Sequence, residues 1–261
     1  VNTRMKSVPK PQNPVPSLSH TETQTTMQIT RKRGLIGCGT LMLLLMASTS
    51  IGLYELREYL LGPVGHYFDS NGVQIHYTDE GQGTPVILVH GFANPANLQW
   101  RRLGRIDALS KDYRVIAFDN RGHGRSEKPH DPEKYGAEMA EDIRRLMDHL
   151  GIAKAHVVGY SMGGFISLKF VAEHPDRVLS AAVCGAGWIR PTPENFHFAE
   201  VLADAVQHGD AGPLPQKLGV VDRPLTFVER LATYSSLACF NDAAALSAVA
   251  RSSPRLIVTE E

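Results

Sequence analysis

The sequence predicts an α/β fold in which residues 65–187 form a doubly wound, mostly parallel β-sheet. Three observations predict it: apolar runs of strand length recur along this stretch, segments with helical spacing separate them, and glycine-rich turns follow them. Strands that alternate with helices are joined by right-handed crossovers, which make the strands parallel and place helices on both faces of the sheet.

The predicted strands are of two kinds. Residues 73–81, VQIHYTDEG, alternate apolar and polar side chains and end in a glycine turn, as a half-exposed strand does. The remaining runs are mainly apolar throughout, which is typical of strands covered on both faces of a parallel sheet. These runs are residues 84–92, 113–119, 155–161 and 179–187.

Helical segments separate the later strands and follow the last one. Residues 135–152 repeat apolar side chains at helical spacing, and residues 163–178 predict a second helix. Beyond the sheet, residues 188–250 predict a mostly helical region. The helices expected in this region cover residues 198–209, 224–238 and 241–252.

Composition excludes several classes of partner. Lysine plus arginine and aspartate plus glutamate both number 27, so the net charge is zero and no basic field predicts nucleic-acid binding. The three cysteines, Cys38, Cys184 and Cys239, are too few and too scattered for a disulfide framework or a metal site. We therefore expect neither a metal nor a cofactor.

The first 33 residues differ from the rest of the chain. They are rich in Pro, Thr, Ser and Gln and show no apolar periodicity, which predicts a disordered extension. A second hypothesis is that translation starts near Met27 and that the preceding residues arise from a start-site error. Peptides from residues 1–26 in the native protein would refute that hypothesis.

An uncharged apolar segment, Gly34–Tyr54, follows directly after Arg31, Lys32 and Arg33. Its length is about the ~20 residues that cross a bilayer, and the basic residues before it place the N-terminus in the cytoplasm. Two interpretations remain: a retained membrane anchor with the rest of the chain facing outward, or a signal peptide that directs export after cleavage near residues 48–50. Residues 55–65 are predicted to be a short connector.

The residues Gly159-Tyr160-Ser161-Met162-Gly163 form a G-x-S-x-G pattern between a predicted strand and a predicted helix. In that context the glycines permit a sharp turn that exposes the serine hydroxyl, so Ser161 is the candidate nucleophile. The backbone amides of Met162 and Phe92 are the expected oxyanion donors, because they follow the nucleophile and an earlier strand, respectively.

Four segments together resemble the alpha/beta-hydrolase superfamily: VILVHGF followed by Trp100, VIAFDNRGHGRSEKP, VVGYSMGG and FVAEHPDRV. The resemblance covers roughly Tyr67–Gly187 and is closest to cap-bearing esterases, lactonases, carbon–carbon hydrolases and cofactor-free perhydrolases. It implies a serine nucleophile, a distal histidine base and an acid that orients the base. It implies as well that the helical residues 188–250 form a cap, with residues 251–261 as its truncated exit. Dehalogenases and epoxide hydrolases of the superfamily carry aspartate at the nucleophile position, so Ser161 argues against both chemistries.

The resemblance also implies that the acid and then the histidine follow Ser161 on loops after later core strands. The histidines after Ser161 are His174, His197 and His208, and none is expected on such a loop. His90, His123 and Asp119 precede Ser161 and are interpreted as residues that shape glycine turns. We therefore expect a C-terminally truncated hydrolase that lacks its last core strands, its acid and its base.

The expected activity is hydrolysis of a small apolar ester or related acyl compound, very weak or absent in this chain. One alternative is a cofactor-free perhydrolase or haloperoxidase that uses the same serine. Another is a non-catalytic remnant or a binding protein. The residues expected to line an apolar substrate pocket are Trp188, Phe196, Phe198, Phe227, Tyr234 and Phe240.

Overall fold

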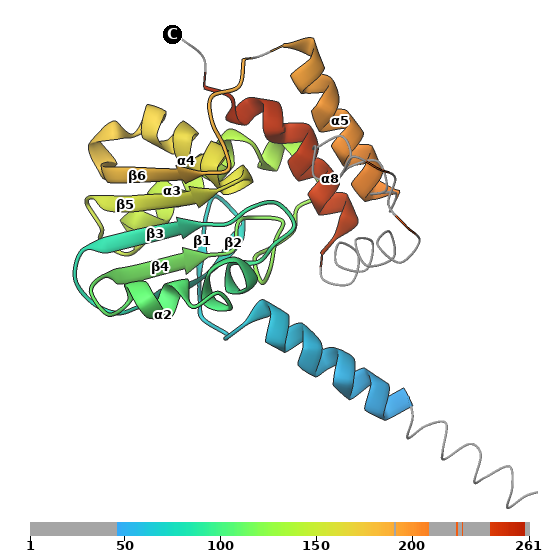
Figure 1. Cartoon of the computed structure of the whole chain (residues 1–261), viewed down its shortest axis with the longest axis horizontal. Helices are drawn as coiled ribbons and strands as arrows, with labels where there is room; N and C mark the ends of the chain where they lie inside the picture. The colour runs from blue at the N-terminus through green and yellow to red at the C-terminus, as the bar shows by residue number, and fades with distance from the viewer. Residues whose placement is uncertain (1–45, 191, 209–222, 224–225, 227–240, 259–261) are drawn as a thin grey trace, which may run out of the picture. The chain divides into compact units, whose positions relative to one another are not determined.

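A six-stranded sheet with the strand order β1-β2-β4-β3-β5-β6 organises the protein (Figure 1). The computed structural model describes residues 46–190, 192–208, 223, 226 and 241–258. The strands are β1 His66–Asp69, β2 Gln74–Glu80, β3 Pro85–Val89, β4 Arg114–Phe118, β5 Ala155–Tyr160 and β6 Val178–Cys184. The helices are α2 Arg105–Leu109, α3 Ala137–His149, α4 Met162–Glu173, α5 Pro193–Gln207 and α8 Ala243–Ser252, with short helical turns η1 Asn97–Arg101, η2 Pro132–Lys134, η3 Pro175–Arg177 and η4 Ser253–Leu256.

The sheet is mixed, with a parallel centre. Strand β3 is parallel to both β4 and β5, and β5 is parallel to β6, whereas β1 and β2 are antiparallel to their neighbours. The parallel, doubly wound centre confirms the predicted fold class. Strand β1 was not predicted, because His66–Asp69 is too short to show a pattern of its own.

The core lies on both faces of the central strands. Strands β3 and β4 are almost fully buried, which explains their continuous apolar sequences. On one face they pack against α3 and α4, and the helical spacing predicted for residues 135–152 is confirmed by the buried side chains of Met139, Ile143 and Leu146. On the other face Trp100 and Ile106 cover the two strands.

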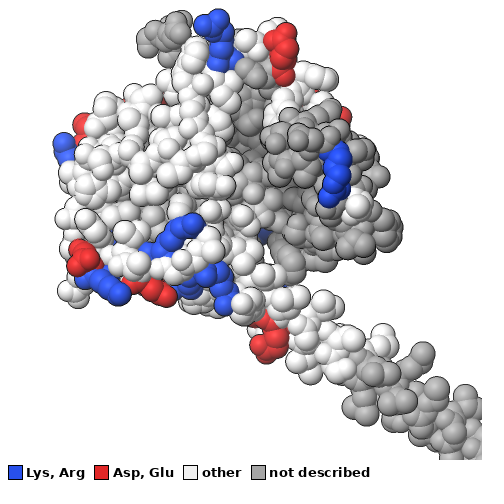
Figure 2. Space-filling view, viewed as in Figure 1, with Lys and Arg blue, Asp and Glu red and all other residues white. Residues whose placement is uncertain are grey.

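Strand β6 lies at the edge of the sheet in the described part of the chain, and its pairing partner there is β5. Most of its residues are exposed, including Leu179. Figure 2 shows that the surface over β5 and β6 carries few charged side chains, whereas charges gather along the rim near α2. An uncharged, exposed edge strand is a template for pairing with another chain.

Residues 46–61 are helical, so the stretch predicted as a connector is partly helix. The chain divides into two units, residues 1–55 and 56–261. Within the second unit, Arg125 bonds both Glu58 and the carbonyl of Gly62, and the Asn97 side chain donates to the Tyr59 and Leu60 carbonyls. These bonds join the end of the helix to Asn97, which follows β3, and to Arg125, which follows β4.

Within the described residues, no helix combines the length and apolar character that crossing a membrane would require. The predicted segment Gly34–Tyr54 is described only from residue 46, and the predicted extension 1–33 lies outside the described residues.

Helices α5 and α8 pack against each other beyond the carboxyl ends of the parallel strands (Figure 1). Arg251 of α8 joins them by ion pairs to Glu200 and Asp204 of α5. Both helices match segments predicted for the cap, whereas the predicted helix 224–238 lies outside the described residues.

Candidate active site

Ser161 occupies the turn between β5 and α4, as predicted. Its backbone has φ 53° and ψ −119°, a region that residues with a side chain rarely adopt. The Ser161 amide donates a 2.8 Å hydrogen bond to the Cys184 carbonyl at the end of β6. Strain of this kind persists only where the surroundings impose it, and it is concentrated at functional sites.

Close packing beneath the turn explains the two glycines of the motif. A Cβ atom at Gly163 would lie 2.1 Å from the Val89 carbonyl oxygen, and one at Gly159 would lie 2.2 Å from the Gly163 carbonyl oxygen. The first turn of α4 therefore packs directly on the end of β3, and no side chain fits between them. This contact places Ser161 beside the loop that follows β3.

The two predicted oxyanion donors flank Ser161. Met162 is the first residue of α4, and Phe92 follows Gly91, where a Cβ atom would lie 3.4 Å from the Ser161 Cβ. Within the described residues, neither the Phe92 amide nor the Met162 amide donates a hydrogen bond. Amide donors without acceptors are the groups that an oxyanion hole requires.

His90 orders the loop that carries Phe92. Its Nδ1 lies 2.8 Å from the Gly91 carbonyl oxygen, and its Nε2 accepts a 2.8 Å hydrogen bond from the Asn120 amide. Burial lowers the pKa of His90, so the ring is neutral and Nδ1 carries the proton. Both ring nitrogens are occupied, so His90 does not serve Ser161 as a base.

His123 and Asp119 also support this loop. Burial, helped by the neighbouring His90, lowers the pKa of His123 to about 3. The His123 ring packs edge-on against Phe92 with ring centroids 5.9 Å apart. The Asp119 carboxylate accepts hydrogen bonds from the Ala96 and Arg125 amides and pairs with a histidine of β2. The interpretation of these residues as turn-shaping therefore agrees with their contacts.

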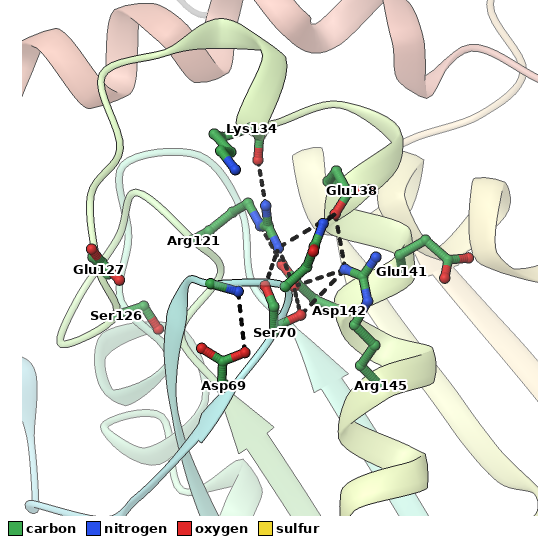
Figure 3. Close-up of polar contacts among 12 residues, drawn as sticks. Asp69, Ser70, Arg121, Ser126, Glu127, Lys134, Glu138, Glu141, Asp142 and Arg145 are labelled. Atoms are coloured by element: carbon green, nitrogen blue, oxygen red, sulfur yellow. Dashed lines mark hydrogen bonds and ion pairs between the residues drawn. The ribbon is translucent and has the colours of Figure 1, made fainter.

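A buried ion pair anchors the loop that contains His123 (Figure 3). The guanidinium of Arg121 bonds both carboxylate oxygens of Asp142 on α3, at 2.6 and 2.7 Å, and also donates to the Lys134 and Ser70 carbonyls. Arg121 and Asp142 are both almost completely buried. The sequence did not reveal this pair, because residues 21 positions apart show no shared pattern until the fold brings them together.

The described residues offer Ser161 no general base. The Ser161 hydroxyl makes no hydrogen bond among them. His174 is bonded to Glu141 at the far end of α4, and His208 bonds the Asp204 carbonyl at the end of α5. His197 lies on the exposed side of α5.

One group of side chains has the composition of a metal site. Ligand atoms of Glu141, Glu173 and His174 lie within 4.8 Å of one another. However, Arg144 and Lys169 already pair with the two carboxylates. The group also lies at the end of α4 opposite to Ser161, so it has no part in the candidate active site.

An apolar groove of about 240 Å³ runs along α4. Phe165, Leu168 and Val171 line one side, and residues 187–189 and 256–258 line the other. Trp188 lines this apolar groove, and its indole donates to the Val258 carbonyl; its place in a substrate pocket remains a prediction. Phe196 and Phe198 lie on α5, whereas Phe227, Tyr234 and Phe240 lie outside the described residues.

Comparison with known proteins supports the same family. The family model for the alpha/beta hydrolase fold matches residues 84–214. The chain is 37% identical over 139 residues to a putative carbamate hydrolase RutD of Caulobacter vibrioides, which covers 53% of this chain and 48% of that protein. It spans about half the length of the curated relatives that it matches.

Solved structures agree with the fold. An enol-lactonase from Burkholderia xenovorans LB400 has 28% identity and a TM-score of 0.55, with 72% of each chain covered. The bottromycin epimerase BotH has 29% identity and a TM-score of 0.56, with 71% of this chain and 70% of that chain covered. From its sequence, its sheet and its strand–turn–helix serine, the chain belongs to the alpha/beta hydrolase fold family.

Proposed function

We propose that this chain carries the nucleophile and oxyanion half of a serine hydrolase site acting on small esters or related acyl compounds. The Ser161 hydroxyl gives up its proton to water or to a base outside the described residues, Oγ bonds the carbonyl carbon, and the carbonyl π electrons move onto the oxygen. The Phe92 and Met162 amides donate to that oxygen. The oxyanion electron pair then re-forms the carbonyl as the alkoxide leaves and takes up a proton, and water hydrolyses the acyl-serine to release the acid and restore the Ser161 hydroxyl.

The observation that carries the proposal is the left-handed backbone of Ser161 at a strand–helix junction, beside two amides without acceptors. A serine that only closed a turn would not need the close packing seen at Gly163. His90 is neutral, and both of its ring nitrogens are hydrogen-bonded, so it does not take the Ser161 proton.

The substrate class rests on relatives that share a carbonyl target. The similar proteins include a carbamate hydrolase and an enol-lactonase, and a carbamate and an enol lactone both present a carbonyl carbon to a nucleophile. This shared feature supports an acyl compound as the substrate of this chain. The epimerase shows that this fold also serves other chemistry, so the site and not the fold supports the proposal. The groove beside Phe165 and Trp188 is suited to an apolar substituent.

Hydrolysis of phenyl acetate by the chain and by Ser161→Ala tests the reaction. Without a base, we expect turnover close to that of Ser161→Ala, since a site that lacks a triad member retains at most about 10³–10⁴-fold over water. Strong turnover that depends on Ser161 would show that a base reaches it from undescribed residues. An unchanged tetrahedral adduct with phenylboronic acid in Ser161→Ala would refute the nucleophile itself.

A membrane location is part of the same proposal. We infer that residues 34–54 either anchor the chain with its hydrolase unit facing outward or direct its export, on the basis of their apolar sequence behind three basic residues. Expression from Met27 in a bacterial cell, followed by alkaline extraction of membranes, distinguishes the two. An anchored protein stays in the membrane pellet, whereas a soluble form beginning near Ile51 indicates cleavage.

A further inference from the structure

Ala93, the residue after Phe92, has an unusual backbone. Its φ is 57°, and it is one of three non-glycine residues with positive φ in the described part of the chain. The left-handed region penalises any residue that carries a Cβ atom, so something outside Ala93 must hold it there. The question is which contacts do so and whether they serve the Phe92 amide.

The loop from Gly91 to Ala96 is held at several points from the core side. The Phe92 ring packs against His123, and the Ala96 amide donates a 2.8 Å hydrogen bond to buried Asp119. These contacts fix the beginning and the end of the loop. Neither of them touches the Ala93 peptide.

The Ala93 carbonyl is bonded by a residue that leads into α8. The Asn241 side chain donates a 3.3 Å hydrogen bond to the Ala93 carbonyl oxygen. The backbone at Asn241 is fixed by the next residue, Asp242. The Asp242 side chain caps α8 by accepting from the Ala245 amide, and it pairs with His130 at 2.8 Å. Asn241 therefore joins α8 to the loop that carries the oxyanion donor.

We propose that Asn241 is a positioning residue for the oxyanion hole: by holding Ala93 in its left-handed conformation, it keeps the Phe92 amide directed toward Ser161. The inference rests on the proposed function of Ser161 and Phe92. A single hydrogen bond contributes about as much free energy as a left-handed alanine costs, so removing the bond allows the loop to leave this conformation.

Binding of phenylboronic acid tests this without requiring a base. The Ser161 Oγ–boron bond forms, the hydroxyl proton goes to solvent, and boron becomes a tetrahedral anion whose oxygen needs the oxyanion donors. The dissociation constant is measured by ¹¹B NMR for the full chain and for Asn241→Ala and Asn241→Asp. Benzamide, a neutral trigonal analogue, is measured in parallel, and thermal melting checks that each variant is folded.

We expect both Asn241 variants to bind phenylboronic acid about tenfold more weakly, with benzamide affinity changed less than about threefold. The double variant Ala93→Gly/Asn241→Ala should recover most of the boronate affinity, because glycine adopts a positive φ without a steric cost. If Asn241→Ala alone folds poorly, the boronate affinity of the double variant still tests the inference.

Three results would overturn the inference: unchanged boronate affinity in the Asn241 variants, an equal loss for boronate and benzamide, or no rescue by glycine. Absence of any tetrahedral adduct in the unsubstituted chain is a different failure. It would refute Ser161 as the nucleophile, and with it the function on which the inference rests.

Discussion

Gly163 and Val89 approach so closely that a Cβ atom at residue 163 would lie 2.1 Å from the Val89 carbonyl oxygen. The obstacle is main chain, which cannot rotate away as a side chain can. Half-buried Ser161 lies at the end of the sheet because this contact lets the first turn of α4 reach the end of β3.

Gly163→Ala is therefore expected to destabilise the protein by about 3 kcal/mol or more, since the added methyl forces α4 away from β3. The control is Gly187→Ala, because Gly187 has no atom within 4 Å of an added Cβ. Thermal melting should show a large fall for the first variant and little change for the second. Equal melting temperatures would mean that α4 shifts at almost no cost.

The ion pair of Arg121 and Asp142 is expected to be essential to stability. Removing one partner leaves the other charge buried without a partner, so Arg121→Met should cost about 3–5 kcal/mol. Arg144→Met is the matched control, because Arg144 pairs with Asp148 at the surface and such pairs contribute about 0–1 kcal/mol. Urea unfolding of both variants measures the difference, and similar losses would contradict the assignment.

Stability should fall in acid because of buried neutral histidines. The pKa of His123 is about 3 in the folded state, against 6.5 for an unperturbed histidine, and burial is the main cause. Between pH 6.5 and 3, His123 is therefore protonated in the unfolded chain and neutral in the folded chain. Titration of His123 has no effect on the free energy of unfolding above pH 6.5. Between pH 6.5 and 3 it lowers that free energy by about 1.4 kcal/mol per pH unit.

His123→Asn should flatten this dependence, although it lowers stability at pH 8. The free energy of unfolding of the two proteins, measured from pH 8 to pH 4, checks the slope. His90, whose pKa is also lowered, remains in both proteins and leaves some dependence. Parallel profiles would show that His123 is protonated without loss of the fold.

The edge strand β6 should promote association. Leu179 is 46% exposed on this strand, and an uncharged edge favours pairing between chains. Leu179→Lys should reduce association in light scattering, whereas Leu103→Lys, at a 60% exposed residue on the loop before α2, should not. A monodisperse monomer of the unsubstituted chain would contradict this prediction.

The sequence predicted the parallel centre, α3 and the Ser161 turn because each depends on local patterns: apolar runs, helical spacing and paired glycines. The roles of Phe92 and Met162 as oxyanion donors, inferred from the His-Gly and G-x-S-x-G motifs, remain predictions. The sequence could not predict the link from Asn241 to Ala93, because those residues are 148 positions apart and neither type is distinctive. The connector prediction missed that the helix continues to residue 61, where Asn97 bonds the Leu60 carbonyl and Arg125 bonds the Gly62 carbonyl.

The most direct test of the central claim, that Ser161 is a nucleophile set beside two oxyanion donors, is a crystal structure of the protein with phenylboronic acid. We predict a tetrahedral boron bonded to Ser161 Oγ, with one boronate oxygen within hydrogen-bonding distance of both the Phe92 and Met162 amides. A trigonal, unbonded boron, or a tetrahedral adduct whose oxygens turn away from both amides, would contradict the account.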